Sequence, residues 1–380
     1  MKLTKSSLNN SYVYLIILGI SLSYFSILGF RVLPFLVLIS FLLNFLNSQK
    51  FFFDKSLIPA VFIIVTVFFM SFFINDFNSV FSIIIFFLIV YWPQFLRKES
   101  ISQERLNKYI NVYVYAGFFM GVGVLLQYIL YKNFGITIGK VDELYERIGF
   151  GFIWTDFSFF SLYLASIIPI VWHKKSFYVS LSLSLFFLYC ALITSARTGP
   201  VSVFILLLLL IFIYFFKVIF YKKRFNLKRL LLSLVPTIFL IFFLKNILLT
   251  NFSRVFDLDP SGRFDGYYES YNFLSNNIVF GAYYNIDFYK NNVGVIPHNL
   301  FIYNIVLGGV LFFIVFIFWF LIIAKNIFTT KDIFIRYSLL VCIIGFQFIP
   351  AIFTAYFFAF LLSLMFYSKR LDKLSVKNLL

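Results

Sequence analysis

The chain has 380 residues, of which 62% are hydrophobic, 23% aromatic and only 12% charged, and its formal net charge is +17. A soluble domain is roughly 45–50% apolar and about 25% charged, so this composition excludes a water-soluble globular protein and predicts a polytopic membrane protein. The excess of basic residues lies in short segments between apolar runs, where it indicates orientation in the membrane and not a nucleic-acid partner. Cys190 and Cys342 both lie inside apolar runs, so neither a disulfide framework nor a cysteine metal site is expected.

Apolar runs long enough to cross a bilayer recur along the whole chain, since about 20 mostly apolar residues span a hydrocarbon core of roughly 30 Å. The expected spans are, in chain order, 12–30, 32–47, 57–74, 79–96, 110–131, 154–172, 176–194, 198–220, 230–249 and 298–324. A final run over 337–367 would be about 46 Å long as one helix, and Pro350 lies near its middle. We therefore expect two short helices there, and an all-α polytopic membrane domain over residues 1–380 with about twelve transmembrane helices.

The distribution of Lys and Arg indicates which ends of the spans face the cytoplasm. With a cytoplasmic N-terminus and twelve spans, 23 of the 32 basic residues fall on the cytoplasmic side, as the positive-inside rule requires. A single final helix would instead export the basic C-terminal segment. The first run follows Lys2 and Lys5 and is longer than the apolar core of a signal peptide, so we expect it to remain as the first helix. Both termini are predicted to be cytoplasmic.

Two segments on the predicted outer side are longer than a turn needs. They are 132–153 and 250–297, and the second, between spans 9 and 10, contains six Tyr and six Phe. Long ordered loops in compact proteins are usually functional. The stretch DPSGRFDGYYESYNFL within the second loop predicts a short amphipathic helix, with Asp259 as its N-cap and Pro260 as its first residue.

Charged and aromatic side chains share faces of that short helix. Arg263, Tyr267 and Tyr271 recur at intervals of four residues and lie on one face, and Asp265 and Glu269 lie on another. One Arg with two Tyr offers charge and ring surface to a sugar-like ligand. The alternative is a helix that lies on the membrane with its tyrosines at headgroup depth.

Arg197 is the main charged residue within the apolar part of the sequence, in a tight turn between the seventh and eighth spans. A guanidinium fixed at the outer interface suits bidentate binding of phosphate, and the alternative is an Arg that extends to lipid headgroups. Arg147, before the sixth span, either binds the same ligand or pairs with Glu143 or Glu146. Asp156, at the outer end of the sixth span, is expected to orient a nearby Arg or hydroxyl.

The two histidines differ in their surroundings. His173 lies beside two lysines in a cytoplasmic turn, where we expect a solvated surface residue. His298 opens the tenth span on the outer side, where the helix dipole favours a neutral imidazole that can act as a general base or a hydrogen-bond donor. The alternative for His298 is a capping role or a hydrogen bond to a backbone carbonyl. Gly308 and Gly309 follow, and predict close packing against another helix.

Several short motifs occur in a fixed order along the second half of the chain. They are RIGFGF at Arg147, SARTG at Arg197, GRF at Arg263, PHN at His298 and LGG at Gly308. In a twelve-span chain with a cytoplasmic N-terminus, this order resembles the bacterial O-antigen polymerase and O-antigen ligase superfamily, which are GT-C-type glycosyltransferases with polyprenyl-diphosphate donors. The resemblance covers roughly 147–309 by motif and the whole chain by topology.

The resemblance implies a periplasmic active site in the bacterial inner membrane, and no cofactor is expected. No metal is expected either, because the one Asp-x-Asp match on the outer side, Asp257-Leu-Asp259, has no phosphate-binding context beyond the arginines. The resemblance assigns the donor diphosphate to arginines, namely Arg197, Arg263, Arg147 and Arg254, with the choice between Arg254 and Arg263 left open. The catalytic candidates are His298, Arg197 and Glu269, and the glycan-contact candidates are Tyr267, Tyr271 and Asp265, with Asp265 also a substitute base. The expected partners are a polyprenyl-diphosphate-linked oligosaccharide, membrane lipid and a chain-length regulator protein.

Within the superfamily, polymerase and ligase differ in the acceptor, which is another lipid-linked repeat unit or the outer core sugar of lipid A. The Phe-, Asn- and Tyr-rich composition and the compact length favour the polymerase. A lipid-linked oligosaccharide flippase is a more distant alternative, although transporters commonly place ionisable groups at the bilayer midplane. A purely structural membrane protein would leave the clustered Arg and His of the large loop unexplained.

Overall fold

The computed structural model describes residues 5–27, 30–47, 53–96, 100–144, 147–173, 175–220 and 263–377 of the chain. Most of these residues are helical, since the apolar runs satisfy their backbone hydrogen bonds internally. The α-helices are α1 (Lys5–Ser21), α2 (Val32–Asn47), α3 (Leu57–Ile74), α4 (Asn78–Tyr91), α5 (Gln103–Phe134), α6 (Phe157–Ile170), α7 (Phe177–Ile193), α8 (Thr198–Phe220), α10 (Arg263–Asn276), α11 (Ile286–Val293), α12 (Leu300–Thr329), α13 (Ile333–Gly345) and α14 (Tyr356–Lys377).

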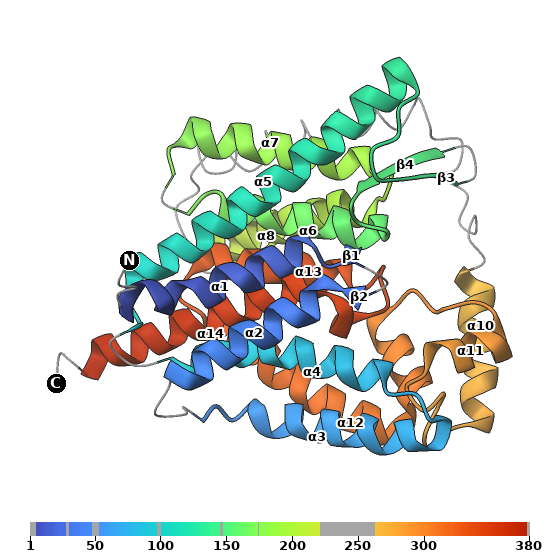
Figure 1. The fold of residues 1–380 in the computed structure, drawn as a ribbon. Helices are drawn as coiled ribbons and strands as arrows, with labels where there is room; N and C mark the ends of the chain where they lie inside the picture. Colours follow the sequence, from blue (N-terminus) through green and yellow to red (C-terminus); the bar gives the residue numbers. More distant parts are fainter. Residues whose placement is uncertain are drawn as a thin grey trace.

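The helix bundle has two different ends (Figure 1). α1 begins and α14 ends at one of them, which we call the terminal end. The other, which we call the hairpin end, carries α10, α11 and two antiparallel hairpins, β1 (Ser26–Ile27) with β2 (Phe30–Arg31) and β3 (Lys140–Leu144) with β4 (Arg147–Phe152). These strands add to the predicted all-α fold: one hairpin joins α1 to α2, and the other joins α5 to α6.

Several helices have the length and composition of membrane spans. Five are long and apolar enough to cross a membrane, at Leu57–Ile74, Asn78–Phe95, Gln103–Phe134, Thr198–Phe216 and Leu300–Thr329. Shorter apolar helices of 10–17 residues are Ser11–Ser21, Val32–Phe45, Phe157–Ile170, Phe177–Ile193 and Ile333–Gly345. The protein is therefore mostly helical with several candidate membrane helices, while the number of twelve spans stays a prediction. The predicted span 230–249 lies outside the described residues.

Some helix ends differ from the predicted spans. The prediction of one span over 12–30 is wrong at its end, because α1 stops at Ser21 and the chain then turns through β1 and β2. α4 passes into the 3-10 helix η1 (Trp92–Phe95), which contains Pro93, since proline cannot donate a helical hydrogen bond. α5 begins earlier than predicted because the Ser102 hydroxyl caps it, accepting a hydrogen bond from the Arg105 amide at 3.3 Å.

The final apolar run divides around Pro350, as predicted. α13 ends at Gly345 and α14 begins at Tyr356, with the 3-10 helix η3 (Ile352–Thr354) between them. α14 then returns toward the terminal end. Every side chain from Tyr356 to Tyr367 is buried, so α14 is a central helix of the bundle.

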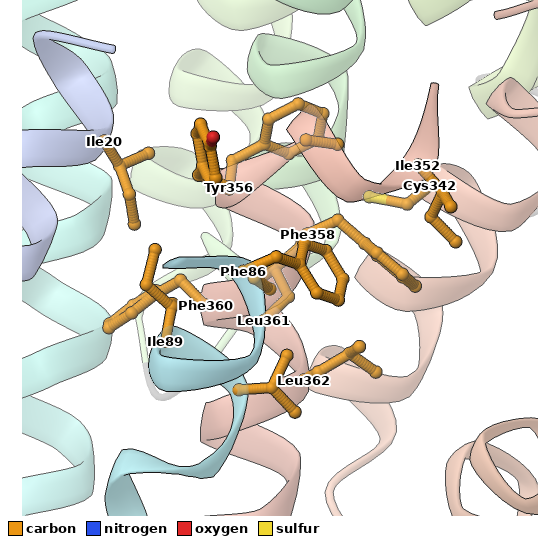
Figure 2. Packing of buried hydrophobic residues seen from close by; sticks show 14 of the residues in the cluster. Ile20, Phe86, Ile89, Cys342, Ile352, Tyr356, Phe358, Phe360, Leu361 and Leu362 are labelled. Carbon is orange, nitrogen blue, oxygen red and sulfur yellow. The ribbon is translucent and has the colours of Figure 1, made fainter. Parts of the chain in front are cut away.

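The core around α14 is built from large aromatic and aliphatic side chains (Figure 2). The ring of Phe358 lies 5.1 Å from that of Phe346 and 6.4 Å from that of Phe86 on α4, centroid to centroid. Phe360 stacks at 5.2 Å on Tyr113 of α5. Such aromatic pairs add to the stability that area burial provides, and they fix α14 between α4 and α5.

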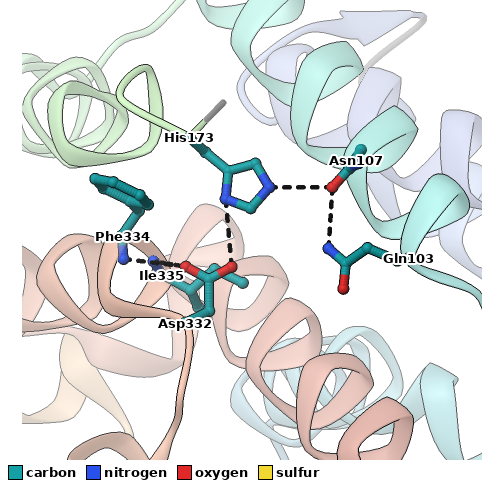
Figure 3. Close-up of polar contacts among 6 residues, drawn as sticks. All are labelled: Gln103, Asn107, His173, Asp332, Phe334 and Ile335. Carbon is teal, nitrogen blue, oxygen red and sulfur yellow. Dashed lines mark hydrogen bonds and ion pairs between the residues drawn. The ribbon is translucent and has the colours of Figure 1, made fainter. Parts of the chain in front are cut away.

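His173 is buried at the terminal end, contrary to the prediction of a solvated surface residue (Figure 3). Its side chain is 9% exposed. Its Nδ1 lies 3.3 Å from Asp332 and its Nε2 lies 3.0 Å from Asn107 on α5. Asp332 also caps α13, accepting hydrogen bonds from the Phe334 and Ile335 amides. The turn after α6 therefore folds against α5 and α13, which the basic sequence around His173 did not indicate.

Candidate active site

A cavity of about 910 Å³ lies at the hairpin end. Its walls come from α2, α4, α6, the start of α12 and the chain between α13 and α14, which are far apart in sequence. The polar and charged residues that line it are Arg31, Asn78, Ser79, Ser82, Asp156, Ser158, His298 and Thr354, together with the tyrosines Tyr24, Tyr284, Tyr303 and Tyr356. A concave space with a few convergent polar groups is the usual form of a small-molecule site.

His298 lines this cavity and its side chain is exposed. α12 begins at Leu300, and Asn299 is its N-cap: the Asn299 side-chain oxygen accepts hydrogen bonds from the Phe301 and Ile302 amides at 3.0 and 3.2 Å. The capping role left open for His298 therefore belongs to Asn299. His298 lies just before the cap and lines the cavity.

The start of α12 is fastened to the break between α13 and α14. The Asn299 side-chain amide donates to the Gln347 side chain at 3.2 Å, and the Leu300 backbone amide donates to the Phe346 carbonyl at 3.0 Å. The break itself lines the cavity through Phe348 to Ala351. Irregular backbone at membrane depth is tolerated where it is buried or lines a cavity, so this break is part of the site's construction.

A kink in α12 brings a second segment to the cavity. Gly309 has φ 62° and ψ −173° within the helix, and a Cβ there would meet the Val279 carbonyl oxygen at 2.2 Å. The amide of Val310 donates to the Ile278 carbonyl at 2.9 Å. Gly309 thus allows close packing, as predicted, but its partner is the loop after α10 and not another helix.

The same loop places Tyr284 in the cavity wall. The Tyr284 hydroxyl donates to the Asn304 side chain at 3.0 Å, and its carbonyl accepts from the Ser79 hydroxyl at 2.8 Å. The Asn285 side chain donates to Asp76 at 2.7 Å. These contacts attach the loop to the start of α4 on one side and to α12 on the other, which closes this wall.

Opposite charges line the part of the cavity nearest β1 and β2. Arg31 is the last residue of β2 and precedes α2, and Asp156 precedes α6. Both influence Tyr24: burial raises the pKa of the Tyr24 hydroxyl well above its ordinary value, Asp156 raises this pKa further and Arg31 lowers it. Both charges therefore act on the Tyr24 hydroxyl, while the orienting role of Asp156 stays a prediction.

Asp156 is the N-cap of α6, and its carboxylate accepts a hydrogen bond from the Phe159 amide at 3.0 Å. Burial raises the pKa of Asp156 above its ordinary value, and the amides of Phe159 and Ser158 act in the opposite direction. A carboxylate that is partly desolvated and held by a helix N-terminus is well placed to accept a proton or a hydrogen bond from a ligand hydroxyl.

Arg197 does not line this cavity. It lies half-buried in the turn between α7 and α8, and the Ser161 hydroxyl of α6 donates to the neighbouring Ala196 carbonyl at 3.1 Å. β4 packs against the same turn, because a Cβ at Gly149 would lie 3.0 Å from the Ser195 hydroxyl oxygen. The structure therefore brings the strand that begins with Arg147 to the turn of Arg197.

The arginines of the large loop can be compared with the prediction only in part. α10 confirms the expected helix and its backbone is described from Arg263, whereas Arg254 and the predicted cap at Asp259 lie outside the described residues. Asp265 lies in the first turn of α10.

Three of the predicted site residues on α10 do not line the cavity. They are Tyr267, Glu269 and Tyr271; Tyr271 is 71% exposed, and Glu269 is exposed. The helix instead buries Ser270, whose hydroxyl lies 2.8 Å from that of Tyr289 on α11. Glu269 therefore does not line the cavity that His298 lines, and its catalytic role stays a prediction.

Arg31 and the cavity tyrosines were not among the predicted site residues. One signal could have identified Arg31: it is the only charged residue between Lys5 and Lys50, and a charge at the end of an apolar span is a functional candidate. The tyrosines Tyr24, Tyr303 and Tyr356 gave no comparable signal, because 25 tyrosines are spread over the chain.

Comparison of the chain with protein-family models and with curated protein sequences found no match. Among the described residues, no group of three or more His, Cys, Asp or Glu side chains is arranged to hold a metal ion. What the cavity offers is an imidazole, a carboxylate and a guanidinium around one space, with tyrosine rings between them. This set suits acid–base chemistry on a polar ligand that carries negative charge.

Proposed function

We propose that this protein is a membrane glycosyltransferase that joins polyprenyl-diphosphate-linked oligosaccharide units, as an O-antigen polymerase does, on the periplasmic face of the bacterial inner membrane. The observation that supports this best is the cavity at the hairpin end, where His298, Arg31 and Asp156 line one space. The motif order around His298 and the distribution of basic residues support the same function and orientation.

The proposed reaction exchanges one bond at the anomeric carbon of the donor. The bond from this carbon to the diphosphate oxygen breaks, and the acceptor hydroxyl oxygen forms a bond to the carbon. His298 accepts the proton of that hydroxyl, and polyprenyl diphosphate leaves with the electron pair of the broken bond. A positioned base contributes about 10²–10⁴-fold to such a step, and fixed positive charge stabilises the departing diphosphate.

Two groups of cations are candidates for holding the diphosphate. Arg31 lines the cavity that contains His298, whereas Arg197 and Arg147 belong to the neighbouring turn and strand. Arg263, with Arg254 as the alternative, would add charge from the large loop. In this proposal Arg31 binds the diphosphate nearest the reacting atoms. Arg197 is tested as the alternative ligand of the diphosphate.

The function is tested by a gel of surface glycolipid from a strain that lacks the gene and carries the wild-type gene or a variant. We expect a ladder with wild type, and core bearing a single repeat unit with His298→Ala and with Arg31→Ala. Lys132→Ala is the control, because Lys132 is an exposed cation at the end of α5, and it should restore the ladder. Immunoblots of membranes check that each variant is present.

Other outcomes separate the alternatives. Bare core with polymer accumulated on the polyprenyl carrier identifies a ligase, which transfers the glycan to lipid A-core. Lipid-linked units trapped on the cytoplasmic face identify a flippase. A full ladder in the strain without the gene, or from His298→Ala, contradicts the proposed polymerase. Loss of the ladder in Arg197→Ala but not in Arg31→Ala assigns the diphosphate to the Arg197 turn instead.

A further inference from the structure

The cavity has two chemically different parts. One contains the charged side chains of Arg31, Asp156 and His298. The other is formed by apolar side chains of α2 and α4, namely Pro34, Phe35 and Leu38 on α2 and Phe81 and Ile83 on α4, with the polar Asn78, Ser79 and Ser82 of α4 beside them. A ligand that fills both parts has a polar anionic end and an apolar end.

The apolar wall runs along one face of α2 and begins next to Arg31. Pro34, Phe35 and Leu38 follow the spacing i, i+1 and i+4, which places them on the same side of the helix. Arg31 is the last residue of β2 and directly precedes α2 at the hairpin end. At 1.5 Å per residue the helix from Val32 to Leu38 extends for about 9 Å, so the apolar wall continues from the charged part toward the interior of the bilayer.

α2 also packs against the 3-10 helix that follows α4. The Asn44 side chain donates to the Trp92 carbonyl of η1 at 3.4 Å, and the rings of Phe41 and Phe95 lie 5.0 Å apart. Toward the hairpin end α2 and α4 both line the cavity. The space between α2 and α4 is therefore bounded by η1 on the side of the terminal end.

The wall is open at its side. Phe35 is 54% exposed, Leu38 is 37% exposed and Phe81 is 47% exposed, although each lines the cavity. In Figure 1, α4 lies between α2 and the pair α3 and α12. α4 exposes Phe81 in its first turn and is largely buried after it, whereas α2 also exposes Ile39 and Leu42. In a membrane, the exposed apolar side chains of α2 and of the start of α4 face lipid chains, so a molecule can enter the cavity there sideways from the bilayer.

We propose that a single-chain anionic lipid enters the cavity sideways between α2 and α4, with its chain on Phe35, Leu38 and Phe81 and its diphosphate at Arg31. The inference rests on the proposed function for the identity of the headgroup. Charge complementarity with Arg31 selects a phosphorylated headgroup, and the apolar row beside it selects a chain that stays in the membrane.

A second groove lies on the bundle, between α3 and α12, with a volume of about 720 Å³. The residues that line it are apolar, among them Ile58, Phe62 and Phe318. It offers no charged side chain for a headgroup, so it suits ordinary lipid chains. The chain of a lipid probe could also bind in this groove, so the experiment must distinguish binding there from binding between α2 and α4.

The experiment measures binding of a polyprenyl diphosphate without sugar to the full-length protein in nanodiscs, so it needs no glycosyl transfer. The probe carries a photoreactive group on its chain, and crosslinked peptides are identified by mass spectrometry. Polyprenyl alcohol, which lacks the headgroup, and inorganic diphosphate, which lacks the chain, are the comparison ligands. We expect both to bind at least tenfold more weakly than the polyprenyl diphosphate, and we expect crosslinks in α2 and α4.

Two pairs of variants test the two parts of the site. Arg31→Ala is expected to weaken binding at least tenfold, and Lys132→Ala is the control cation. Leu38→Trp fills the opening and is expected to reduce crosslinking to α2 and α4 at least tenfold. Its matched control is Ile39→Trp, because Ile39 is 48% exposed on the same helix but does not line the cavity.

The inference is overturned if crosslinks fall on α3 and α12, or if Leu38→Trp and Arg31→Ala bind the probe as well as wild type does. It is also overturned if inorganic diphosphate binds as tightly as the lipid. Failure of the proposed function looks different: the protein would bind and crosslink the lipid as expected, while the glycolipid ladder would not depend on it.

Discussion

At the scale of single residues, Asp156 combines two opposed effects. The helix N-terminus favours its charged form, and burial disfavours it strongly enough that its pKa is raised. Because the pKa of Asp156 is higher in the folded than in the unfolded state, the folded state keeps this proton at pH values between the two pKa values, where the unfolded state has already lost it. Folding stability from this group is therefore fully present below the unfolded pKa of about 3.9 and is lost as the pH rises through the raised pKa.

Asp156→Asn tests this sign. Asn caps a helix about as well as Asp, so the hydrogen bond to the Phe159 amide is retained while the titration is removed. We expect the melting temperature of wild type in detergent to fall relative to that of the Asn variant between about pH 4 and neutrality. The difference should level off above the folded pKa. A difference in melting temperature between the two proteins that stays constant over this pH range would show that Asp156 is not desolvated.

At the scale of secondary-structure elements, the kink in α12 depends on a conformation that glycine alone adopts easily. Gly309 has positive φ with extended ψ, a region that costs other residues of order 1–3 kcal/mol, and a Cβ would also collide with Val279. Gly309→Ala is therefore expected to lower stability by more than Gly135→Ala. Gly135 also has positive φ, at 68°, but nothing lies within 4 Å of its Cβ position.

Thermal unfolding of both variants in detergent checks this prediction. Equal losses of stability in Gly309→Ala and Gly135→Ala would mean that only the backbone conformation of the glycine matters. The contact of Gly309 with the loop after α10 would then contribute nothing. Because that loop carries Tyr284 into the cavity wall, Gly309→Ala should also weaken lipid-probe binding, whereas Gly135→Ala should not.

The sequence predicted the positions of most helices but not which residues together form the cavity. Hydropathy located the helices because a membrane helix satisfies its own backbone, and Pro350 located the break because proline interrupts that pattern. The cavity depends instead on pairings between distant segments, such as Ser79 with Tyr284. No local period encodes such a contact, so the sequence did not predict that Arg31 and His298 line the same cavity.

At the scale of the whole molecule, the two ends of the bundle should face opposite sides of the membrane. Single cysteines can report this, because the native Cys190 and Cys342 are both buried. Thr137→Cys and Ser275→Cys place a thiol at exposed positions of the hairpin end, and Lys331→Cys places one at the terminal end. In intact cells a membrane-impermeant maleimide is expected to label the first two variants, and to label Lys331→Cys only after permeabilisation. The reverse pattern would contradict the proposed periplasmic site.

The central position of α14 has a consequence for how the protein is made. This helix follows in the chain all of the neighbours that enclose it, including α1, α4, α5 and α13. Those helices leave the ribosome first, and they can complete their packing only after α14 has been inserted among them. Until then the cavity lacks the wall that the break before α14 supplies. The cavity is therefore complete only once α14 has been made and inserted.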